Sequence, residues 1–558
     1  MSLYEERFEQ MFPVLDAASI ATAKRFASGE AMTFAPGDQL YDVGTRNVPA
    51  WLVLDGSLEI IRRDGLHRES SVVALSAGQF SGEVSQLSGH GTIAACRAGP
   101  KGCTALPFDA AHIRALMVGS ADLGEIMMRA FILRRVALIE SGGSGSLLIG
   151  HPNAPDAVRI QGFLARNGYP YTVLDVEADA EARAAVERFG VAEHELPLMI
   201  CPNGTLLKRP TDLEAGACLG ITPELDPNKI YDVAVVGAGP AGLAAAVYGA
   251  SEGLSMIVLD QRAFGGQAGA SARIENYLGF PTGISGMALA GRAFNQAQKF
   301  GAEIAIPLQV DKLDCSAVER DARAPFRIAV AGTEVTVLAR TVIIASGARY
   351  RRPAIDNLSE FENNGVSYWA SPIEAKLCEG EEVALIGGGN SAGQAVVFLA
   401  PKVKHLHLIV RRPLEETMSK YLIDRIKALP NVTLYVGSEI VALGGDAAGL
   451  SCATFRDRAT AKEITYPLRH LFLFIGADPN ADWLKGCVDT DDKGFVCTGL
   501  GSFSAGQAKR APHPLETTRP GVFAIGDVRA SSTKRVGAAI GEGAAVVAQI
   551  HKVLAERA

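Results

Sequence analysis

Two glycine-rich turns hold the residues best suited to chemistry. In the first, Gly237, Gly239 and Gly242 follow a buried run at 233–236 and open a helical segment. This GxGxxG spacing provides a tight turn, backbone N–H groups that a pyrophosphate can approach, and close packing of helix on strand. A second strand ends about 20 residues later in Asp260, where a carboxylate can accept from a ribose hydroxyl. Strand, glycines, helix, second strand and acid in this order predict a dinucleotide-binding unit.

The second turn predicts a second dinucleotide site. Gly387, Gly389 and Ala392 occupy the matching positions, and the next strand ends in Arg411 and Arg412 instead of an acid. A guanidinium forks onto phosphate oxygens, so arginine here favours the 2′-phosphate of NADPH. A solvated basic turn is the alternative, which leaves NADH open. Two sites on one chain predict two cofactors, FAD and a nicotinamide nucleotide that delivers hydride to the flavin.

Composition narrows the classes of protein. The chain has 558 residues, with 54 basic and 61 acidic side chains and a formal net charge of −7. An acidic chain is not attracted to phosphate backbones, so we expect no nucleic-acid partner. We find no apolar run of roughly 18 residues and no secretory signal, so we expect no membrane association and a cytoplasmic location. The nine scattered cysteines argue against a disulfide scaffold.

The order of elements divides the chain into blocks. Short alternating segments broken by glycines at about 30–108 predict a β-rich unit, and a helical pattern follows it. The sequence SGGSGS at 141–146 is a flexible linker by composition. Residues 147–222 alternate strand and helix, which predicts a small α/β domain. His405 and His407 share a strand face without a third ligand nearby, so we expect no metal site.

Residues 229–558 resemble the low-molecular-weight thioredoxin reductase family. The matching segments are GGQAGASARIENYLGFP, TVIIASGARYRRP, GVFAIGDV and KRVGAAIGEGAAVV. The resemblance implies a homodimer and an FAD-binding domain in two parts, 229–349 and 473–558, with an NAD(P)H-binding domain inserted at 350–472. It places these residues at FAD: Gly237, Gly239, Ala241, Gly242, Asp260, Gln261, Gly266, Gln267, Asn276, Ser346, Gly347, Gly526, Asp527, Arg535 and Val536. It places these at NADPH: Gly387, Gly389, Asn390, Ser391, Ala392, Arg411 and Arg412.

One departure separates the chain from this family. Where the family has its redox-active CxxC motif, positions 369–372 read Trp-Ala-Ser-Pro, and no CxxC occurs in the chain. Disulfide exchange needs an attacking thiolate and a resolving partner, so we expect no dithiol relay from flavin to thioredoxin. Cys378, the nearest thiol, is interpreted as a bystander, and Trp369 either covers the flavin or serves as a core aromatic. The thioredoxin-reductase-like ferredoxin–NADP reductases share this absence and pass electrons directly from the flavin.

The middle block, 147–222, resembles a glutaredoxin-type thioredoxin fold. Its Cys-Pro-x-Cys positions, 154–157, read Ala-Pro-Asp-Ala, and Pro197 matches the family's cis-proline. A thiolate at the helix start is what makes that fold redox-active. Without it, we expect a spacer, a dimer contact or a docking surface, with Cys201 buried in the third strand.

The N-terminal block, 1–140, resembles the cyclic nucleotide-binding domain family. Gly82 and Glu83 match the start of its phosphate-binding cassette, but Thr92 stands where the phosphate-binding arginine belongs. The loss of that charge-assisted contact is worth about 1.5–3 kcal/mol. We expect weak or no cyclic-nucleotide binding and a regulatory or dimerising role, although Arg97 nearby keeps binding open.

Together these patterns predict a multidomain protein: a β-roll cyclic-nucleotide-binding-like domain, a small α/β thioredoxin-like domain, and a Rossmann-like α/β module with two dinucleotide-binding domains. The predicted function is an FAD-dependent NAD(P)H oxidoreductase of the thioredoxin reductase type. Hydride passes from NADPH to FAD and on to an external acceptor, without a dithiol of its own and without a catalytic side chain.

The sequence leaves the acceptor and the alternatives open. A small redox protein is one acceptor, and Arg349, Arg351 and Arg352 either steer an acidic partner or form a solvated turn. A non-catalytic flavoprotein sensor and a thioredoxin reductase using other cysteines remain as alternative functions.

Overall fold

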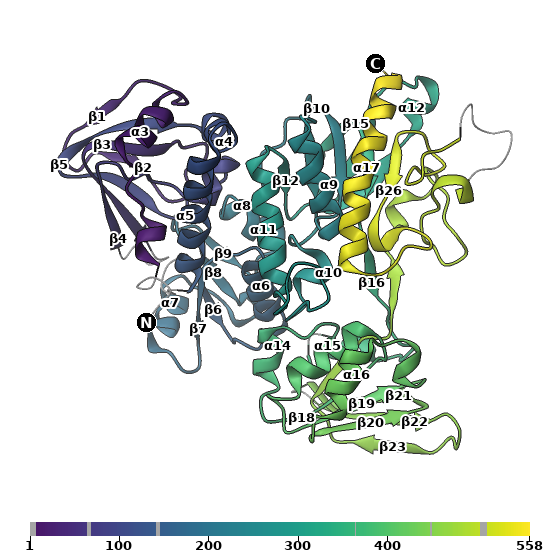
Figure 1. Ribbon diagram of the computed structural model, residues 1–558. Helices are drawn as coiled ribbons and strands as arrows, with labels where there is room; N and C mark the ends of the chain where they lie inside the picture. Colours follow the sequence, from purple (N-terminus) through teal and green to yellow (C-terminus); the bar gives the residue numbers. More distant parts are fainter. Residues whose placement is uncertain are drawn as a thin grey trace.

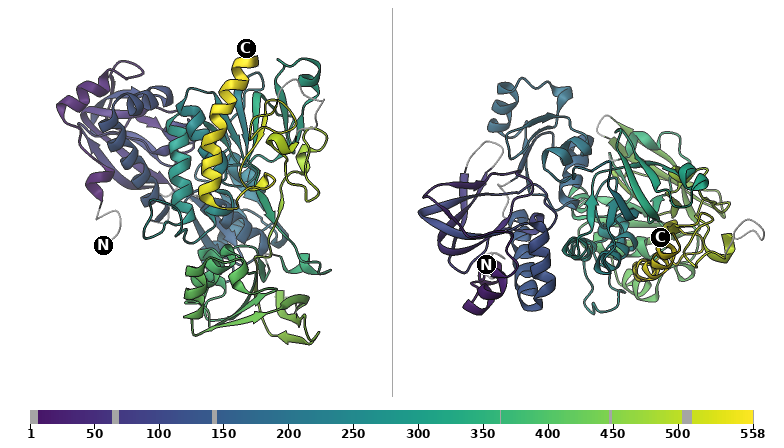
Figure 2. Two further views of the ribbon diagram at one scale, coloured as in Figure 1. Left: turned by 45° about the vertical axis from the view of Figure 1, so that its right-hand side comes forward. Right: turned by 90° about the horizontal axis from the view of Figure 1, so that it is seen from above.

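The computed structural model describes residues 7–63, 69–140, 145–362, 364–446, 449–502 and 511–557. It contains four units, one of which is formed by two separate stretches of the chain (Figures 1 and 2). In Figure 1 the N-terminal and middle units lie on the left, in purple and blue. A central module combines teal segments with the yellow C-terminal segment, and a green unit lies below it. The central module is therefore assembled from two stretches of chain separated by the green unit.

The N-terminal unit is an antiparallel sheet accompanied by helices. Its strand order is β1–β5–β3–β4, and β2 pairs with β5. Gly37, Gly44, Gly56 and Gly78 all have positive φ, which other residues rarely adopt, so these glycines make the turns that the sequence predicts. The elements are α2 (Phe8–Met11), α3 (Ala17–Lys24), β1 (Met32–Phe34), β2 (Gln39–Tyr41), β3 (Ala50–Arg63), β4 (Glu69–Ser76), η1 (Val84–Leu87), β5 (Ala95–Phe108), α4 (Ala110–Gly119) and α5 (Ala121–Glu140).

The middle unit is a four-stranded mixed sheet of order β7–β6–β8–β9. Strands β6 and β7 are parallel, and β8 and β9 run antiparallel to their neighbours. The Leu196–Pro197 peptide bond is cis. The elements are β6 (Ser146–Gly150), α6 (Pro155–Arg166), β7 (Tyr171–Asp175), α7 (Ala180–Arg188), η2 (Glu193–Glu195), β8 (Leu198–Ile200), β9 (Leu206–Lys208) and α8 (Asp212–Cys218).

The central module is built on a seven-stranded sheet. Strands β12–β11–β10–β15 are parallel, β14 and β13 continue them antiparallel, and β26 adds to β15. Helices α9, α11 and α17 pack their small side chains into one buried cluster beside the sheet (Figure 1). The elements are β10 (Ile230–Val236), α9 (Pro240–Ser251), β11 (Met256–Leu259), α10 (Gly266–Gly269), α11 (Gly286–Lys299), β12 (Glu303–Ala305), β13 (Val310–Asp314), α12 (Ser316–Arg320), β14 (Phe326–Val330), β15 (Thr336–Ile344), η4 (Asp482–Leu484), η5 (Gly499–Ser502), β26 (Val522–Ala524), η6 (Gly526–Val528) and α17 (Val536–Arg557).

The green unit carries a five-stranded parallel sheet of order β17–β24–β18–β19–β20 and an antiparallel three-stranded sheet, β21–β22–β23. Buried aliphatic residues of β18, β19 and α15 form its core. The elements are α13 (Leu358–Phe361), β17 (Val366–Ser367), α14 (Pro372–Leu377), β18 (Glu382–Ile386), α15 (Asn390–Leu399), β19 (His405–Val410), η3 (Leu414–Glu416), α16 (Lys420–Lys427), β20 (Val432–Val436), β21 (Ser438–Asp446), β22 (Gly449–Asp457), β23 (Glu463–Tyr466) and β24 (His470–Leu473).

Two short strands carry the chain into and out of this unit. Strand β16 (Ala348–Tyr350) pairs antiparallel with β25 (Ala477–Pro479). Arg349 forms a salt bridge of 2.9 Å with Asp482 of η4, and Arg351 forms one of 2.7 Å with Asp478 of β25. Arg352 forms a third, of 2.7 Å, with Glu362. The arginine cluster is thus paired with acids of this chain, which favours a structural role over steering a partner.

Four of the nine cysteines form two disulfides, although their scattered positions argue against a disulfide scaffold. Cys201 at the end of β8 pairs with Cys218 of α8, and Cys315 pairs with Cys487 across a sequence separation of 172 residues. Cys201 is fully buried, as expected, but not as a free thiol. The sequence could not reveal these pairs because each depends on how distant segments approach. Within the described ranges, no helix is long and apolar enough to cross a membrane.

Candidate functional site

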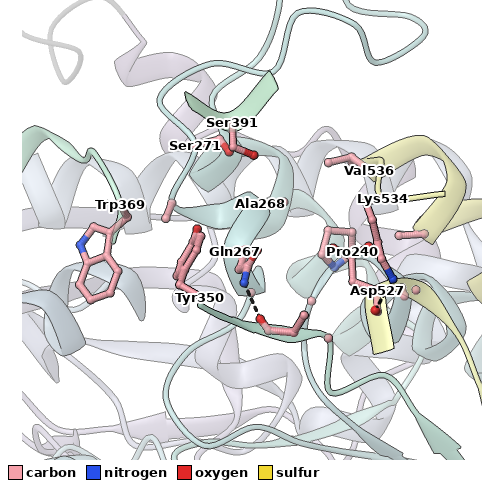
Figure 3. Close-up of a pocket in the computed structure, with 18 of the residues that line it drawn as sticks. Pro240, Gln267, Ala268, Ser271, Tyr350, Trp369, Ser391, Asp527, Lys534 and Val536 are labelled. Atoms are coloured by element: carbon pink, nitrogen blue, oxygen red, sulfur yellow. Dashed lines mark hydrogen bonds between the residues drawn. The ribbon is translucent and has the colours of Figure 1, made fainter. Parts of the chain in front are cut away.

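A cavity of 440 Å³ lies where the central module meets the green unit and the middle unit (Figure 3). All the residues expected at FAD line it except Gly242. The lining comes from the first glycine turn, the end of β11, the segment around α10, the end of β15, η6 and the start of α17. The cavity therefore collects segments from both parts of the expected FAD domain.

The first glycine turn has the geometry of a nucleotide cradle. Gly237 has φ +112°, and an added Cβ would lie 2.2 Å from the Ala345 carbonyl oxygen. An added Cβ on Gly242 would lie 1.9 Å from the Gly237 carbonyl oxygen, so this glycine packs the helix on the turn and does not face the cavity. Gly239 is the N-cap of α9, where the nearest atom to an added Cβ is 3.9 Å away. Open space beside a helix N-terminus fits a pyrophosphate.

Asp260 has a structural role that sequence reasoning missed. Its carboxylate accepts backbone N–H bonds from Ala238 at 2.8 Å, Arg262 at 3.0 Å and Ala263 at 3.2 Å. Burial raises the pKa of this carboxyl, and the three N–H groups oppose that shift. Asp260 thus fixes the glycine turn to the end of β11 while it lines the cavity. A bond to a ribose hydroxyl stays a prediction.

Two charged side chains, Asp527 and Lys534, line the cavity near Pro240, on the side away from Trp369 (Figure 3). Burial raises the pKa of Asp527, and Lys534, which was not among the residues expected at FAD, donates to the Asp527 backbone carbonyl at 2.5 Å. Burial also lowers the pKa of Lys534. The Gln267 amide donates to the Ala348 carbonyl, which holds α10 against β16. These contacts give the cavity a fixed polar wall.

The start of α15, directly after the second glycine turn, lines the same cavity, although Gly387 and Gly389 do not. Asn390 and Ser391, at the start of α15, line it together with Gln394 and Phe398. An added Cβ on Gly389 would meet nothing within 4 Å, so the helix start is accessible to a ligand. The two expected nucleotide sites are therefore parts of one continuous space.

The other residues expected at NADPH lie outside that lining. Gly387 has φ +146° and an added Cβ would lie 2.4 Å from the Phe474 carbonyl oxygen, which makes it a packing position. Ala392 is buried in the core. Arg411 and Arg412 are exposed at the end of β19, with Arg412 3.7 Å from Glu416. Contact of these arginines with a 2′-phosphate remains a prediction.

The positions of the missing CxxC form a helix start. Glu374, buried to 8% exposure, accepts from the Trp369 indole at 2.8 Å and from the Ser371 backbone N–H at 2.9 Å. The Ser371 hydroxyl also donates to this carboxylate, an arrangement typical of a helix N-terminus. Trp369 and Ala370 line the cavity, which favours a role for Trp369 at the cofactor over one in the core.

No cysteine is among the described residues that line the cavity. Cys378 is fully buried, and burial raises the pKa of its thiol to about 11, as befits a bystander. A thiol with such a pKa supplies almost no thiolate near neutral pH. Electron transfer without a thiol of this site stays a prediction.

In the N-terminal unit, the side chains considered for cyclic-nucleotide binding contact other residues of the same chain. The Thr92 hydroxyl donates to the Asp42 carbonyl at 2.7 Å, and Arg97 bonds Glu59 at 2.9 Å. Glu83 is buried and lies 3.3 Å from Arg135. The expectation of weak or no cyclic-nucleotide binding stays a prediction.

Comparisons with known proteins assign a family to most of the chain. The sequence profile of the pyridine nucleotide-disulphide oxidoreductase family matches residues 231–543, more than half of the chain. An alkyl hydroperoxide reductase component of Escherichia coli is 32% identical over 340 residues, which are 61% of this chain and 61% of that protein, so the chain spans less than two thirds of this relative. Thioredoxin reductase of Mycolicibacterium smegmatis is 31% identical over 330 residues, 59% of this chain and 98% of that protein.

A solved structure matches a share of the chain similar in size to the family match. The crystal structure of T. acidophilum thioredoxin reductase covers 58% of this chain and 99% of its own, with 27% identity and a TM-score of 0.51. Its extent agrees with that of the family match, which begins at the first nucleotide-binding strand. The chain therefore belongs to the pyridine nucleotide-disulphide oxidoreductase family of FAD-dependent enzymes that use NAD(P)H.

Proposed function

We propose that this protein is an NAD(P)H oxidoreductase in which electrons pass from the nicotinamide nucleotide to FAD and leave to an external acceptor. The observation that carries the proposal is the shared cavity, which is lined by the first glycine turn and by the start of α15 and whose described lining contains no cysteine. Bound FAD would supply the capacity to accept a hydride and release electrons one or two at a time. The chain itself binds, orients and shields the reactants.

Binding and orientation are the tasks that these residues can perform. The starts of α9 and α15 offer backbone N–H groups to two pyrophosphates, and the glycines there leave room for close approach. Asp527 and Lys534 provide polar contacts at one end of the cavity, and Trp369 provides an aromatic surface at the other (Figure 3). Hydride transfer needs correct distance and orientation more than a proton donor, so no catalytic acid or base is assigned.

Because the chain contains two disulfides, electron transfer from the flavin through one of them is the alternative to direct transfer to an external acceptor. None of Cys201, Cys218, Cys315 and Cys487 is among the described cavity-lining residues. Cys315 and Cys487 belong to the hydrophobic core formed by β13, β14 and η4. Electron exit directly from the flavin edge fits this arrangement better than exit through either pair.

Anaerobic stopped-flow measurements test the proposal. We expect flavin absorbance to bleach within a second of mixing with NADPH, and to return on adding ferredoxin, quinone or oxygen. The double variants Cys201→Ser/Cys218→Ser and Cys315→Ser/Cys487→Ser should behave like wild type in both half-reactions. Ordinary turnover with thioredoxin disulfide, abolished in either double variant, would instead establish a sulfur relay.

A contact between units favours regulation as a second candidate function. Arg135 of α5 lies 3.3 Å from Glu83, donates to the Gly168 carbonyl of the middle unit at 3.0 Å, and stacks on Tyr169 at 4.9 Å. Glu83 is where the cyclic-nucleotide-binding family would hold a ribose, so a ligand there would alter this link. We expect calorimetric titration with cyclic AMP and cyclic GMP to show no micromolar binding; binding that changes the rate of flavin reduction would support the sensor.

A further inference from the structure

The middle unit contributes a charged side chain to the cofactor cavity. Arg166, the last residue of α6, lines the cavity and donates to the Gly266 carbonyl at 2.9 Å. In Figure 1, α6 lies beside α10 and above α14, at the meeting point of three units. A side chain of a domain outside the family match therefore reaches into the nucleotide site.

The contact is held in place by its neighbours. Asn167, buried to 7% exposure, donates both to the Phe163 carbonyl of its own helix and to the Arg262 carbonyl of the central module, each at 2.9 Å. An added Cβ on Gly162 would lie 3.5 Å from the Arg262 guanidinium, so α6 packs closely there. The end of α6 is thus fixed against the segment that follows β11.

Two guanidinium groups, those of Arg166 and Arg262, lie near each other at this point, and no acid among the described residues is in direct contact with either of them. In the part of the chain that the structure describes, neither Arg166 nor Arg262 has a carboxylate oxygen within 4.0 Å. Burial lowers the pKa of Arg166 and the positive charge of Arg262 lowers it further, whereas the more distant carboxylates of Asp260 and Glu374 raise it. Arg262 also lies over the Trp369 ring at 5.6 Å. Both arginines are partly buried, and a bound anion in contact with two like-charged guanidiniums would lower their mutual repulsion.

The position of Arg166 indicates which anion that is. Its partner Gly266 faces Gly239, since an added Cβ on Gly266 would lie 3.0 Å from the Gly239 Cα atom. Gly239 caps α9, where a dinucleotide pyrophosphate is expected. The guanidinium fork matches phosphate oxygens, whereas the single ammonium of lysine does not.

We propose that Arg166 and Arg262 bind a phosphate group of the dinucleotide in this cavity, so that the middle unit, although it lacks redox cysteines, completes the FAD site. The pyrophosphate of FAD is the favoured source, and a phosphate of the nicotinamide nucleotide at the start of α15 is the other. Cofactor binding and docking of the middle unit then stabilise each other. The inference uses the FAD site of the proposed function and is independent of the electron acceptor.

Titration of the full-length apoprotein with FAD tests this inference, with bound FAD followed by flavin fluorescence. We expect Arg166→Gln to weaken FAD binding about ten- to a hundredfold, the range of a charge-assisted hydrogen bond to phosphate. Arg166→Lys should lie between that variant and wild type, because it keeps the charge but loses the fork. A second titration, of the holoenzyme with NADP⁺, separates the two phosphate sources.

Arg159→Gln is the matched control. Arg159 lies on the same helix, but its guanidinium bonds Asp212 and the Pro210 carbonyl within the middle unit. Arg159→Gln should bind FAD like wild type. Weaker NADP⁺ binding alone in Arg166→Gln would assign the phosphate to the nicotinamide nucleotide. Unchanged binding of both, or equal loss in Arg159→Gln and both Arg166 variants, would overturn the inference even if flavin reduction by NADPH proceeds as proposed.

Discussion

The disulfide between Cys315 and Cys487 gives a quantitative test of how the central module is held together. It joins the segment after β13 to the segment after η4 and encloses the whole green unit within its loop. Replacing Cys487 with serine opens a loop with a sequence separation of 172 residues. In the loop-closure model, the loss of such a cross-link lowers the free energy of unfolding by about 5 kcal/mol at 25 °C.

Urea unfolding of the holoenzyme, followed by flavin fluorescence with and without dithiothreitol, measures this effect. We expect Cys487→Ser to unfold at lower urea, and wild type and Cys487→Ser to share one midpoint in dithiothreitol, which reduces both disulfides of wild type and the remaining Cys201–Cys218 disulfide of the variant. Cys218→Ser is the control: its loop has a sequence separation of 17 residues and the same model gives about 3 kcal/mol, confined to the middle unit. The flavin transition should therefore move less in this variant.

Two results would refute this reasoning. Equal urea midpoints for oxidised wild type and Cys487→Ser would show that the loop does not restrain the unfolded chain. Loss of flavin reoxidation in Cys487→Ser at unchanged stability would show that the pair carries electrons, although neither cysteine lines the cavity.

Three further perturbations have defined outcomes. Gly242→Ala places a Cβ 1.9 Å from the Gly237 carbonyl oxygen, so it should purify with less FAD per chain, measured by the flavin-to-protein absorbance ratio. Arg411→Ala with Arg412→Ala should weaken NADPH binding about tenfold and leave NADH unchanged; an unchanged NADPH-to-NADH affinity ratio would make them a solvated turn. Burial lowers the pKa of His90 to about 4, so the unfolded chain binds a proton first and stability should fall as pH drops from 6.5 towards 4. His90→Gln should flatten that loss in pH-dependent thermal melts.

The replacement of the CxxC motif is a case in which sequence and structure supply different parts of one answer. The residue types at 369–372 exclude thiol chemistry at these four positions, which the sequence alone shows. The structure adds that Glu374 gathers the Trp369 indole and the Ser371 N–H into a helix cap. That pairing required two side chains and a backbone group to converge, which spacing alone did not predict.

The glycine turns were predictable because their requirement is local. A positive φ or a helix packed against its own turn admits only glycine, so spacing identified Gly237 and Gly242 before any tertiary contact was known. The FAD positions around the first turn follow from the family resemblance, and all but Gly242 line the cavity, whereas only Asn390 and Ser391 of the positions expected at NADPH do so.

Only the tertiary structure decided which distant groups meet. Arg166 belongs to the middle unit, whereas the first glycine turn belongs to the central module. Cys315 and Cys487 are separated in sequence by the green unit. No local sequence pattern therefore marks either contact. Steric requirements act within a few residues, so the local sequence predicts them. Charge contacts and disulfide pairing depend on which distant segments the fold brings together, so the local sequence does not predict them.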